Sequence, residues 1–148
     1  MKMKIAIACD HGAYEYKEIV KQMLNDEGHE VEDFGCYNTD SVDYPDYAAK
    51  AAKSVAEGKN ERGIVICGTG IGVSIAANKI KGIRCALCAE PVSARLTREH
   101  NDSNVLAMGQ RVIGVEVMKE IVRVWIHTPF SNDARHQRRI DKVMALED

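Results

Sequence analysis

Residues 64–72 have the sequence IVICGTGIG, and this stretch decides the fold. It starts with β-branched apolar side chains, which are typical of a buried strand. Cys67 ends the apolar run, and a Gly-x-Gly-x-Gly turn follows it. The sequence SIAANK at residues 74–79 then predicts a helix. A strand, a glycine-rich turn and a helix N-terminus together offer free N–H groups and the positive end of a helix dipole. We therefore expect an anion site with a thiol at its edge.

The rest of the chain alternates short apolar runs with segments of helical periodicity. The predicted strands are residues 4–9, 30–34, 63–67, 84–88 and 105–108. Besides 74–79, the predicted helices are residues 13–27, 44–57, 91–100, 115–127 and 133–146. This alternation predicts an α/β fold: a Rossmann-like three-layer sandwich with a five-stranded parallel sheet, helices on both faces and a C-terminal helix. We interpret residues 1–148 as one domain, because no linker or repeat interrupts them.

Charge and composition exclude several classes of partner. The formal net charge is −2, which is too balanced to favour nucleic acid or an anionic membrane surface. The first apolar run meets Asp10 too early for a signal peptide, and no run approaches the roughly 20 apolar residues of a membrane span. The five cysteines are odd in number and lack the spacing of a small disulfide scaffold. These features favour reduced thiols and a cytoplasmic protein.

Cys85 and Cys88 formally make a C-x-x-C pair, but they lie in a predicted strand. Residues i and i+3 of a strand point to opposite faces, so this pair can neither form a disulfide nor chelate one metal ion. We interpret both cysteines, together with Cys9 and Cys36, as buried structural thiols. The sequence contains no second pair with the spacing of metal ligands, so we expect no bound metal.

The glycine-rich turn matches neither common nucleotide-binding motif. A dinucleotide fingerprint needs its third glycine where Val73 stands, and a P-loop needs Gly-Lys-Ser/Thr. In parallel sheets, ligands bind beyond the carboxyl ends of the strands. The polar or titratable residues that follow predicted strands are Asp10, His11, Cys67, Glu90, Gln110 and Arg111. We expect them to gather at one edge of the sheet, around a small anionic molecule.

The chain resembles the type B ribose-5-phosphate isomerases, within a wider group of sugar-phosphate isomerases that includes galactose-6-phosphate isomerase subunits. The resemblance runs nearly end to end. It rests on CDH at residues 9–11, DYP at 43–45, CGTGIG at 67–72, SIAANK at 74–79, HND at 100–102, GQRV at 109–112, and RHQ at 135–137 with Arg139. One branch of the family has Cys at the position of Cys67, and another has Glu where this chain has Val73. The chain resembles the cysteine branch.

The resemblance implies an aldose–ketose isomerase that needs no cofactor. It would interconvert D-ribose 5-phosphate and D-ribulose 5-phosphate through an enediolate, in the non-oxidative pentose phosphate pathway. Cys67 would be the base, because a helix N-terminus stabilises a thiolate. The N–H groups of residues 68–72 would stabilise the developing oxyanion. Thr69 would hydrogen-bond the thiolate or a substrate hydroxyl, and His100 would protonate the ring oxygen of the closed sugar.

The resemblance also implies which residues hold the substrate. Asp10 and His11 would bind hydroxyls and help open the ring. Arg135 and Arg139, at i and i+4 on the last helix, would bind the phosphate, while His136 would lie elsewhere on that helix. The expected substrate-binding residues are Asp10, His11, Tyr44, Gly68, Thr69, Gly70, Ile71, Gly72, Ser74, Asn101, Arg111, Arg135 and Arg139.

The position of His100 suggests an oligomer. The helix at 91–100 starts at the carboxyl edge of the sheet, so it carries His100 and Asn101 toward the opposite edge, away from Cys67. Either the following loop curls back, or these residues complete the site of a neighbouring copy. The resemblance favours the second case: a homodimer, or a dimer of dimers, with composite active sites.

Three alternatives stay open at this point. The substrate could be a six-carbon phosphate such as allose or galactose 6-phosphate, because the sequence does not give the length of the pocket. The chain could be a non-catalytic sugar-phosphate-binding module, because a fold alone does not fix an activity. The thiol could instead be a nucleophile, in which case a covalent adduct with the substrate would form.

Overall fold

All five predicted strands pair in one parallel sheet in the computed structural model, which describes residues 1–147. The strands are β1 (Lys4–Cys9), β2 (Glu30–Asp33), β3 (Arg62–Cys67), β4 (Cys85–Leu87) and β5 (Val105–Gly109). They lie in the order β2–β1–β3–β5–β4, with every neighbouring pair parallel. The chain runs from β1 out to β2 and then crosses to β3 on the other side of β1. The topological switch point therefore lies between β1 and β3, where open α/β sheets bind ligands.

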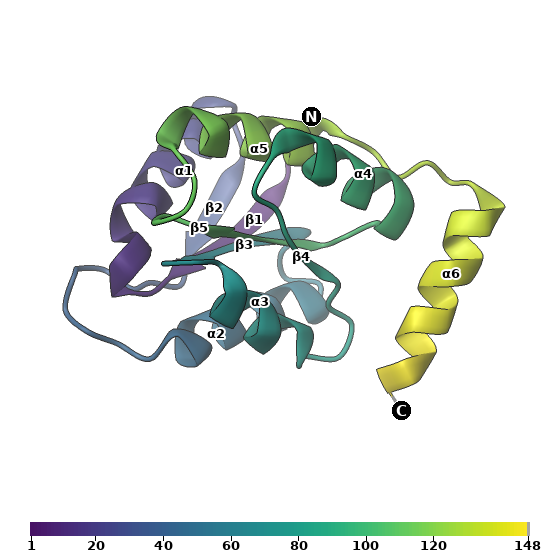
Figure 1. Ribbon diagram of the computed structural model, residues 1–148, viewed down its shortest axis with the longest axis horizontal. Coiled ribbons are helices and arrows are strands. Elements are labelled where there is room, and N and C mark those ends of the chain that lie inside the picture. Colours follow the sequence, from purple (N-terminus) through teal and green to yellow (C-terminus); the bar gives the residue numbers. More distant parts are fainter. Residues whose placement is uncertain (148) are drawn as a thin grey trace.

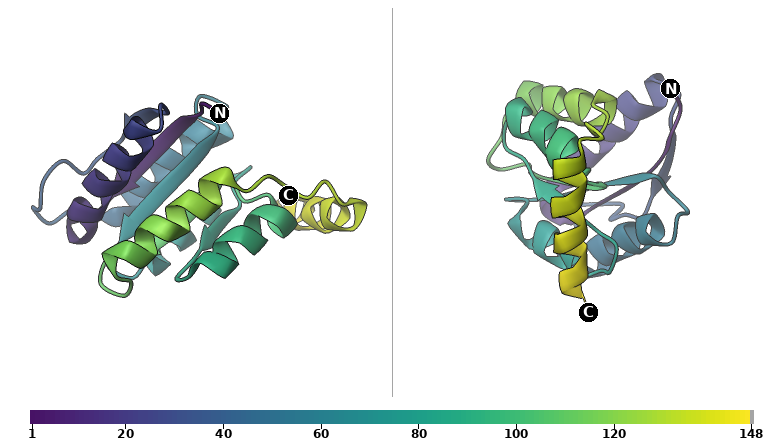
Figure 2. Two further views of the ribbon diagram at one scale, coloured as in Figure 1. Left: turned by 90° about the horizontal axis from the view of Figure 1, so that it is seen from above. Right: turned by 90° about the vertical axis from the view of Figure 1, so that its right-hand side faces the viewer.

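Helices cover both faces of this sheet, as predicted (Figure 1). One face carries α1 (Tyr14–Asp26), α4 (Pro91–Asn101) and α5 (Val115–His127), and the other carries α2 (Tyr44–Ala56) and α3 (Ile71–Asn78). The last helix, α6 (Ala134–Met144), stands outside these layers (Figure 2). Short 3-10 turns precede α1 (η1, His11–Ala13) and follow α6 (η2, Ala145–Glu147). None of the helices described in residues 1–147 is both long enough and apolar enough to cross a bilayer.

The prediction was wrong by three residues for the helix after the glycine-rich turn. We expected it to begin at residue 74, and α3 begins at Ile71. Gly72 therefore lies in the first helical turn and not in the loop. The alternating glycines conceal the start of the helix, because glycine contributes no side chain to an apolar periodicity.

Two apolar clusters fill the two sides of the sheet. The larger cluster lies under α1, α4 and α5 and includes Ile5, Ile7 and Trp125. The smaller cluster lies under α2 and α3 and includes Cys67 and many alanines, such as Ala6. Alternate residues of one strand enter different clusters, because side chains of a strand point to opposite faces. This alternation places the Cys67 side chain on the face of the sheet that α3 covers.

The structure confirms the interpretation of the C-x-x-C pair, with one difference. Cys85 packs against the cluster under α2 and α3, and Cys88 belongs to the cluster on the other face. Cys9 and Cys36 are buried, with sulfur atoms 3.8 Å apart. Cys85, however, is only half-buried, because β4 is an edge strand of the sheet. All five cysteines are free thiols.

Candidate active site

Cys67 ends β3 directly beneath the glycine-rich turn. Its side chain is buried, and the N–H of Gly70 donates a hydrogen bond to its Sγ over 3.1 Å. Such a donor favours the thiolate over the thiol. Helix α3 begins one residue later, so the positive end of its dipole lies near the same sulfur. The turn therefore holds a thiol where its anion is stabilised.

Close packing explains why glycines occupy this turn. Gly70 has a φ of 81°, and a Cβ on it would lie 2.6 Å from Cδ1 of Leu87 and 2.7 Å from the carbonyl carbon of Met108. A Cβ on Gly72 would lie 2.6 Å from ring atoms of Tyr44. The turn thus rests directly on the end of β5, and the Tyr44 ring lies against the first turn of α3.

Only some of the backbone N–H groups around the turn have a partner within the protein. Those of Gly70 and Ile71 already donate to the side chains of Cys67 and Thr69. The first bond within α3 is donated by residue 74, to the carbonyl of Gly70. The N–H groups of residues 72 and 73 precede this bond, so the helix leaves them unpaired. Two of the five N–H groups expected to stabilise an oxyanion, those of residues 70 and 71, are therefore already paired, and the role of residues 68–72 stays a prediction.

The hydroxyl groups of Thr69 and Ser74, which we expected to contact substrate, differ in their hydrogen bonds within the protein. Thr69 is exposed, and its Oγ1 accepts the N–H of Ile71 at 3.2 Å, which leaves its own proton free to donate. Ser74 is buried, and its Oγ donates to the carbonyl of Ile71 at 2.7 Å. The hydroxyl proton of Ser74 is thus used within α3, and the contact of Ser74 with substrate stays a prediction.

Asp10 and His11 lie next to the turn with fixed orientations. Oδ1 of Asp10 accepts the N–H of Gly12 at 3.0 Å and caps η1. Nδ1 of His11 accepts the N–H of Val42 at 3.1 Å, so the proton of a neutral ring is on Nε2. A Cβ on Gly12 would lie 3.8 Å from the backbone nitrogen of Gly68, which shows how closely these segments approach.

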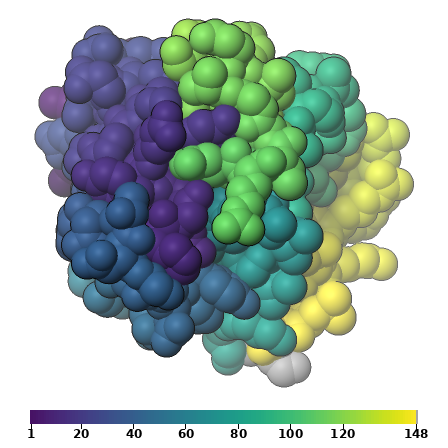
Figure 3. Space-filling view, turned by 60° about the vertical axis from the view of Figure 1, so that its left-hand side comes forward, coloured from purple at the N-terminus to yellow at the C-terminus, as the bar shows by residue number. Residues whose placement is uncertain are grey.

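Arg111 also belongs to this group. Its N–H donates to the carbonyl of Gly68 at 2.9 Å, and its side chain covers that glycine. The segment after β5 is held against the start of α1, because the Oε1 of Gln110 accepts the N–H of Tyr16 at 2.9 Å. These two parts of the chain, in green and purple, adjoin on one face of the molecule (Figure 3). Gln110 therefore has a structural role. Glu90 likewise serves as the cap of α4, where it accepts the N–H groups of residues 92 and 93.

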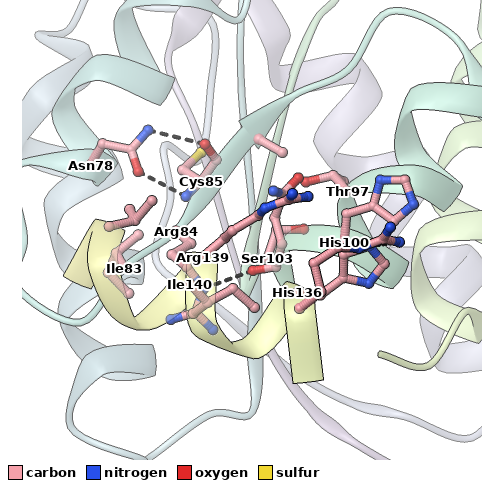
Figure 4. A pocket seen from close by; sticks show the side chains of 14 residues that line it. Asn78, Ile83, Arg84, Cys85, Thr97, His100, Ser103, His136, Arg139 and Ile140 are labelled. Atoms are coloured by element: carbon pink, nitrogen blue, oxygen red, sulfur yellow. Dashed lines mark hydrogen bonds between the residues drawn. The ribbon is translucent and has the colours of Figure 1, made fainter. Parts of the chain in front are cut away.

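A second group of predicted residues lines a pocket of about 690 Å³ between β4, α4 and α6 (Figure 4). It contains His100, Asn101, Arg135 and Arg139. The pocket therefore gathers the expected acid and the two expected phosphate ligands. Arg111, which we expected among the substrate-binding residues, lies in the other group and not here.

His136 is a pocket residue that the sequence did not reveal. We expected it elsewhere on the last helix, apart from Arg135 and Arg139, but it is only 9% exposed, and its ring centroid lies 4.5 Å from that of His100. A signal was present, because His136 and Ile140 are at i and i+4, and both are buried on one face of α6.

The two groups do not meet within one chain. Helix α4 continues to Asn101, and Asp102 ends it with a φ of 44°; β5 then begins at Val105. The intervening loop is too short to curl back, so that alternative was wrong. His100 lies at the amino edge of the sheet, whereas Cys67 pairs with Gly109 at the carboxyl edge. The length of β5, about 13 Å, separates the two edges.

Three cysteines outside the turn, Cys9, Cys85 and Cys88, have raised pKa values. Burial raises the pKa of Cys9 and of Cys85 above the ordinary thiol value, and burial together with nearby Glu90 raises the pKa of Cys88 to about 11. These three are protonated and unreactive at neutral pH. In residues 1–147, no cluster of three or more histidine, cysteine or carboxylate side chains has the geometry of a metal site.

Known proteins match this chain over nearly its full length. The ribose/galactose isomerase family matches residues 5–143. Ribose-5-phosphate isomerase B of Escherichia coli K12 is 47% identical over 144 residues, which cover 97% of this chain and 96% of that protein. The solved structure of ribose-5-phosphate isomerase B from Clostridium thermocellum has a TM-score of 0.96 and 48% identity, covering 98% of this chain and 97% of that one.

Relatives with other substrates also match. The galactose-6-phosphate isomerase subunit LacB of Clostridium acetobutylicum is 36% identical, covering 97% of this chain and 83% of that protein. A D-erythrulose-4-phosphate isomerase of Mycolicibacterium smegmatis is 37% identical, covering 99% of each chain. The reaction type is common to these relatives, and the length of the sugar differs among them.

Proposed function

Because this chain belongs to the ribose/galactose isomerase family and is therefore an aldose–ketose isomerase of sugar phosphates, we propose that its substrates are D-ribose 5-phosphate and D-ribulose 5-phosphate. The observation that carries the proposal is the Cys67 thiol, held under the N–H of Gly70 at the switch point of the sheet. A base in that position can move a proton between two neighbouring carbons of a bound sugar.

The proton transfer uses groups at the carboxyl edge of the sheet. The Cys67 thiolate removes the proton from the carbon next to the carbonyl and returns it to the neighbouring carbon. The unpaired N–H groups of residues 72 and 73 stabilise the oxyanion of the enediolate that forms between these steps. The free hydroxyl proton of Thr69 donates to the thiolate or to a substrate hydroxyl. Asp10 and the Nε2–H of His11 orient the sugar hydroxyls.

Ring opening and phosphate binding require the second group. His100 protonates the ring oxygen, Asn101 binds a sugar hydroxyl, and Arg135 and Arg139 bind the phosphate. Since these side chains lie at the other edge of the sheet from Cys67, we propose that a second copy of the chain supplies them. The enzyme would then be a homodimer, or a dimer of such dimers, in which each active site contains residues of two chains.

An exposed apolar surface beside the turn supports this assembly. Five large apolar side chains that surround the turn and the neighbouring strand ends are between 43% and 60% exposed. They are Ile71, Ile75, Leu87, Val92 and Val112. Several large apolar side chains exposed near one another are typical of an interface. A second copy seated on it would bring its own pocket toward Cys67.

The first experiment is a comparison of Cys67→Ala with the parent chain in the conversion of D-ribose 5-phosphate to D-ribulose 5-phosphate. We expect kcat to fall about 10²- to 10⁴-fold, because the reaction loses its base. Parent turnover should continue in EDTA, since proton transfer by a thiolate needs no metal. Cys88→Ala is the matched control: it removes a buried thiol whose pKa is raised, and it should keep parent kcat.

Three results would contradict parts of this proposal. A parent chain without turnover of the pentose phosphate would overturn the substrate assignment. Galactose 6-phosphate, on which the relative LacB is named as acting, and allose 6-phosphate would then be assayed. A covalent adduct between Cys67 and substrate, seen by mass spectrometry, would favour a nucleophile over a base. Loss of parent activity in EDTA would contradict a metal-free mechanism.

We also place the enzyme in the cytoplasm. Its five cysteines are free, and a reducing compartment keeps thiols in that state.

A further inference from the structure

His136 lies at the centre of the second group, but the proposed chemistry gives it no task. It is 9% exposed, on the face of α6 that is turned toward α4. Its ring is tilted by 39° to that of His100, with the centroids 4.5 Å apart (Figure 4). A buried imidazole between an expected acid and an expected phosphate ligand can influence both.

The hydrogen-bond partners of His136 assign one tautomer to its ring. Nε2 lies 3.4 Å from Nη2 of Arg135, and Nδ1 lies 2.7 Å from Oγ of Ser131. A guanidinium group only donates, so Nε2 must accept, and the proton of the ring is therefore on Nδ1, from where it is donated to Ser131. Oγ of Ser131 also accepts the N–H of Asp133 at 3.1 Å, which ties the ring to the turn before α6.

This arrangement has consequences for both neighbours. The lone pair on Nε2 of His136 gives the Arg135 guanidinium a fixed partner, although Arg135 itself is exposed. The ring of His136 also packs against that of His100, with the centroids 4.5 Å apart, and so limits the orientation of His100.

We propose that His136 is a positioning residue of the isomerase. It acts through Arg135, whose guanidinium it holds for the substrate phosphate, and through His100, whose ring it packs against. The inference rests on the proposed function and extends it by one residue. The inference requires a hydrogen-bond acceptor at the position of Nε2 of His136, where it meets Arg135.

Three variants at this position separate the two nitrogens. His136→Gln places an amide near the position of Nε2, so it can still accept from Arg135. His136→Asn places an amide near Nδ1, so it keeps the bond to Ser131 and loses the one to Arg135. His136→Phe keeps a ring beside His100 and loses both hydrogen bonds. Each variant would be assayed with D-ribose 5-phosphate, and with inorganic phosphate as a competitive inhibitor.

We expect the amide position to decide the affinity for phosphate. His136→Gln should stay within about threefold of the parent KM, whereas His136→Asn and His136→Phe should raise KM about tenfold, the cost of one charge-assisted hydrogen bond. The inhibition constant of inorganic phosphate should rise in step with KM. The control is Arg138→Gln, which changes an exposed residue of α6 outside the pocket and should leave both constants unchanged.

The result that overturns the inference is an equal KM for His136→Gln and His136→Asn, whether both match the parent or both exceed it. A rise in KM without a matching rise in the phosphate inhibition constant would overturn it too. The parent chain in the same assay separates this failure from failure of the proposed function. An active parent with unresponsive variants removes only the role of His136, and an inactive parent removes the substrate assignment.

Discussion

At the scale of single residues, the candidate site depends on a glycine, Gly70, at a position where a side chain would not fit. The N–H of Gly70 reaches the sulfur of Cys67 because this residue adopts a φ of 81° and its backbone lies against Met108. Left-handed backbone is strained for residues with a Cβ, and the contact with Met108 leaves no room for one. The geometry around the thiol is thus set by a steric requirement.

This requirement predicts the effect of Gly70→Ala. The variant should lose about 1–3 kcal/mol of stability from strain and overlap, and it should lose activity because the N–H moves away from Cys67. Stability would be measured by urea unfolding and activity by sugar-phosphate turnover.

The matched control is Gly58→Ala. Gly58 has a similar φ of 77°, but a Cβ on it would meet no atom within 4 Å. The control therefore carries the backbone strain without the overlap, and it should keep its activity. Equal losses of stability and activity in the two variants would show that packing at Gly70 does not matter.

At the scale of elements, the end of β2 is tied to α1 by a partly buried ion-pair cluster. Asp33 accepts hydrogen bonds from Nζ of Lys17 at 2.6 Å, Nζ of Lys21 at 3.0 Å and the N–H of Gly35 at 2.8 Å. Burial alone would raise the pKa of Asp33. The three donors outweigh burial and hold the pKa below its usual value. The side chain of Lys17 is 0% exposed, and its charge is compensated by this carboxylate and, at 3.4 Å, by that of Glu18.

The depressed pKa predicts how stability changes with pH. The carboxylate contributes its full stabilisation above the unfolded-state pKa of about 3.9 and loses it as the pH falls through the lower folded-state pKa. Asp33→Asn should therefore cost up to about 3 kcal/mol at pH 7, because it removes the nearer carboxylate of the buried Lys17 ammonium and leaves only that of Glu18, at 3.4 Å. The free energy of unfolding of the variant should also change less with pH in the acid range than that of the parent. Urea unfolding between pH 2 and pH 7 measures both effects.

The control for this prediction is Asp40→Asn, at an exposed position in the loop before α2. It should leave both the stability at pH 7 and the acid slope of the parent unchanged. Parallel stability curves for the parent and Asp33→Asn across the acid range would contradict the assigned role of Asp33.

The sequence could predict the individual helices and strands, but not all of their packing. Helices and strands follow from local periodicity, and the carboxyl-edge group follows from strand ends, so Cys67, Asp10 and Arg111 could be placed near one another in advance. The insertion of β5 between β3 and β4 could not be predicted, because strand pairing is non-local. The burial of His136 depends on contact between α4 and α6, and a basic helix by itself resembles a solvated one.

At the scale of the whole molecule, α6 packs against α4 and stands apart from the layers of the sheet. It projects beside the body of the protein (Figure 3). Val143, near the end of α6, is 54% exposed, and Leu146, in the following turn η2, is 83% exposed. Its arginines nevertheless line a pocket with His100. An arm that carries expected substrate ligands, while Cys67 lies at the other edge of the sheet, is suited to reach a neighbouring copy.

Composite sites predict that two inactive variants restore each other. Cys67→Ala removes the base, and His100→Ala removes the acid from the other group. If each site combines Cys67 of one chain with His100 of the other, a mixed dimer contains one doubly altered site and one intact site. Random mixing makes half of the dimers mixed, so about a quarter of the sites, and of the parent activity, should return.

The mixture would be unfolded and refolded together so that the subunits exchange, and turnover of D-ribose 5-phosphate would be measured. The control is each variant refolded alone, which should stay inactive. A mixture that remains as inactive as its components would mean that both residues act within one chain. A parent protein that is fully active as a monomer in light scattering would lead to the same conclusion. Recovery near one quarter can arise only from sites that two chains share, because no single chain in the mixture contains both residues.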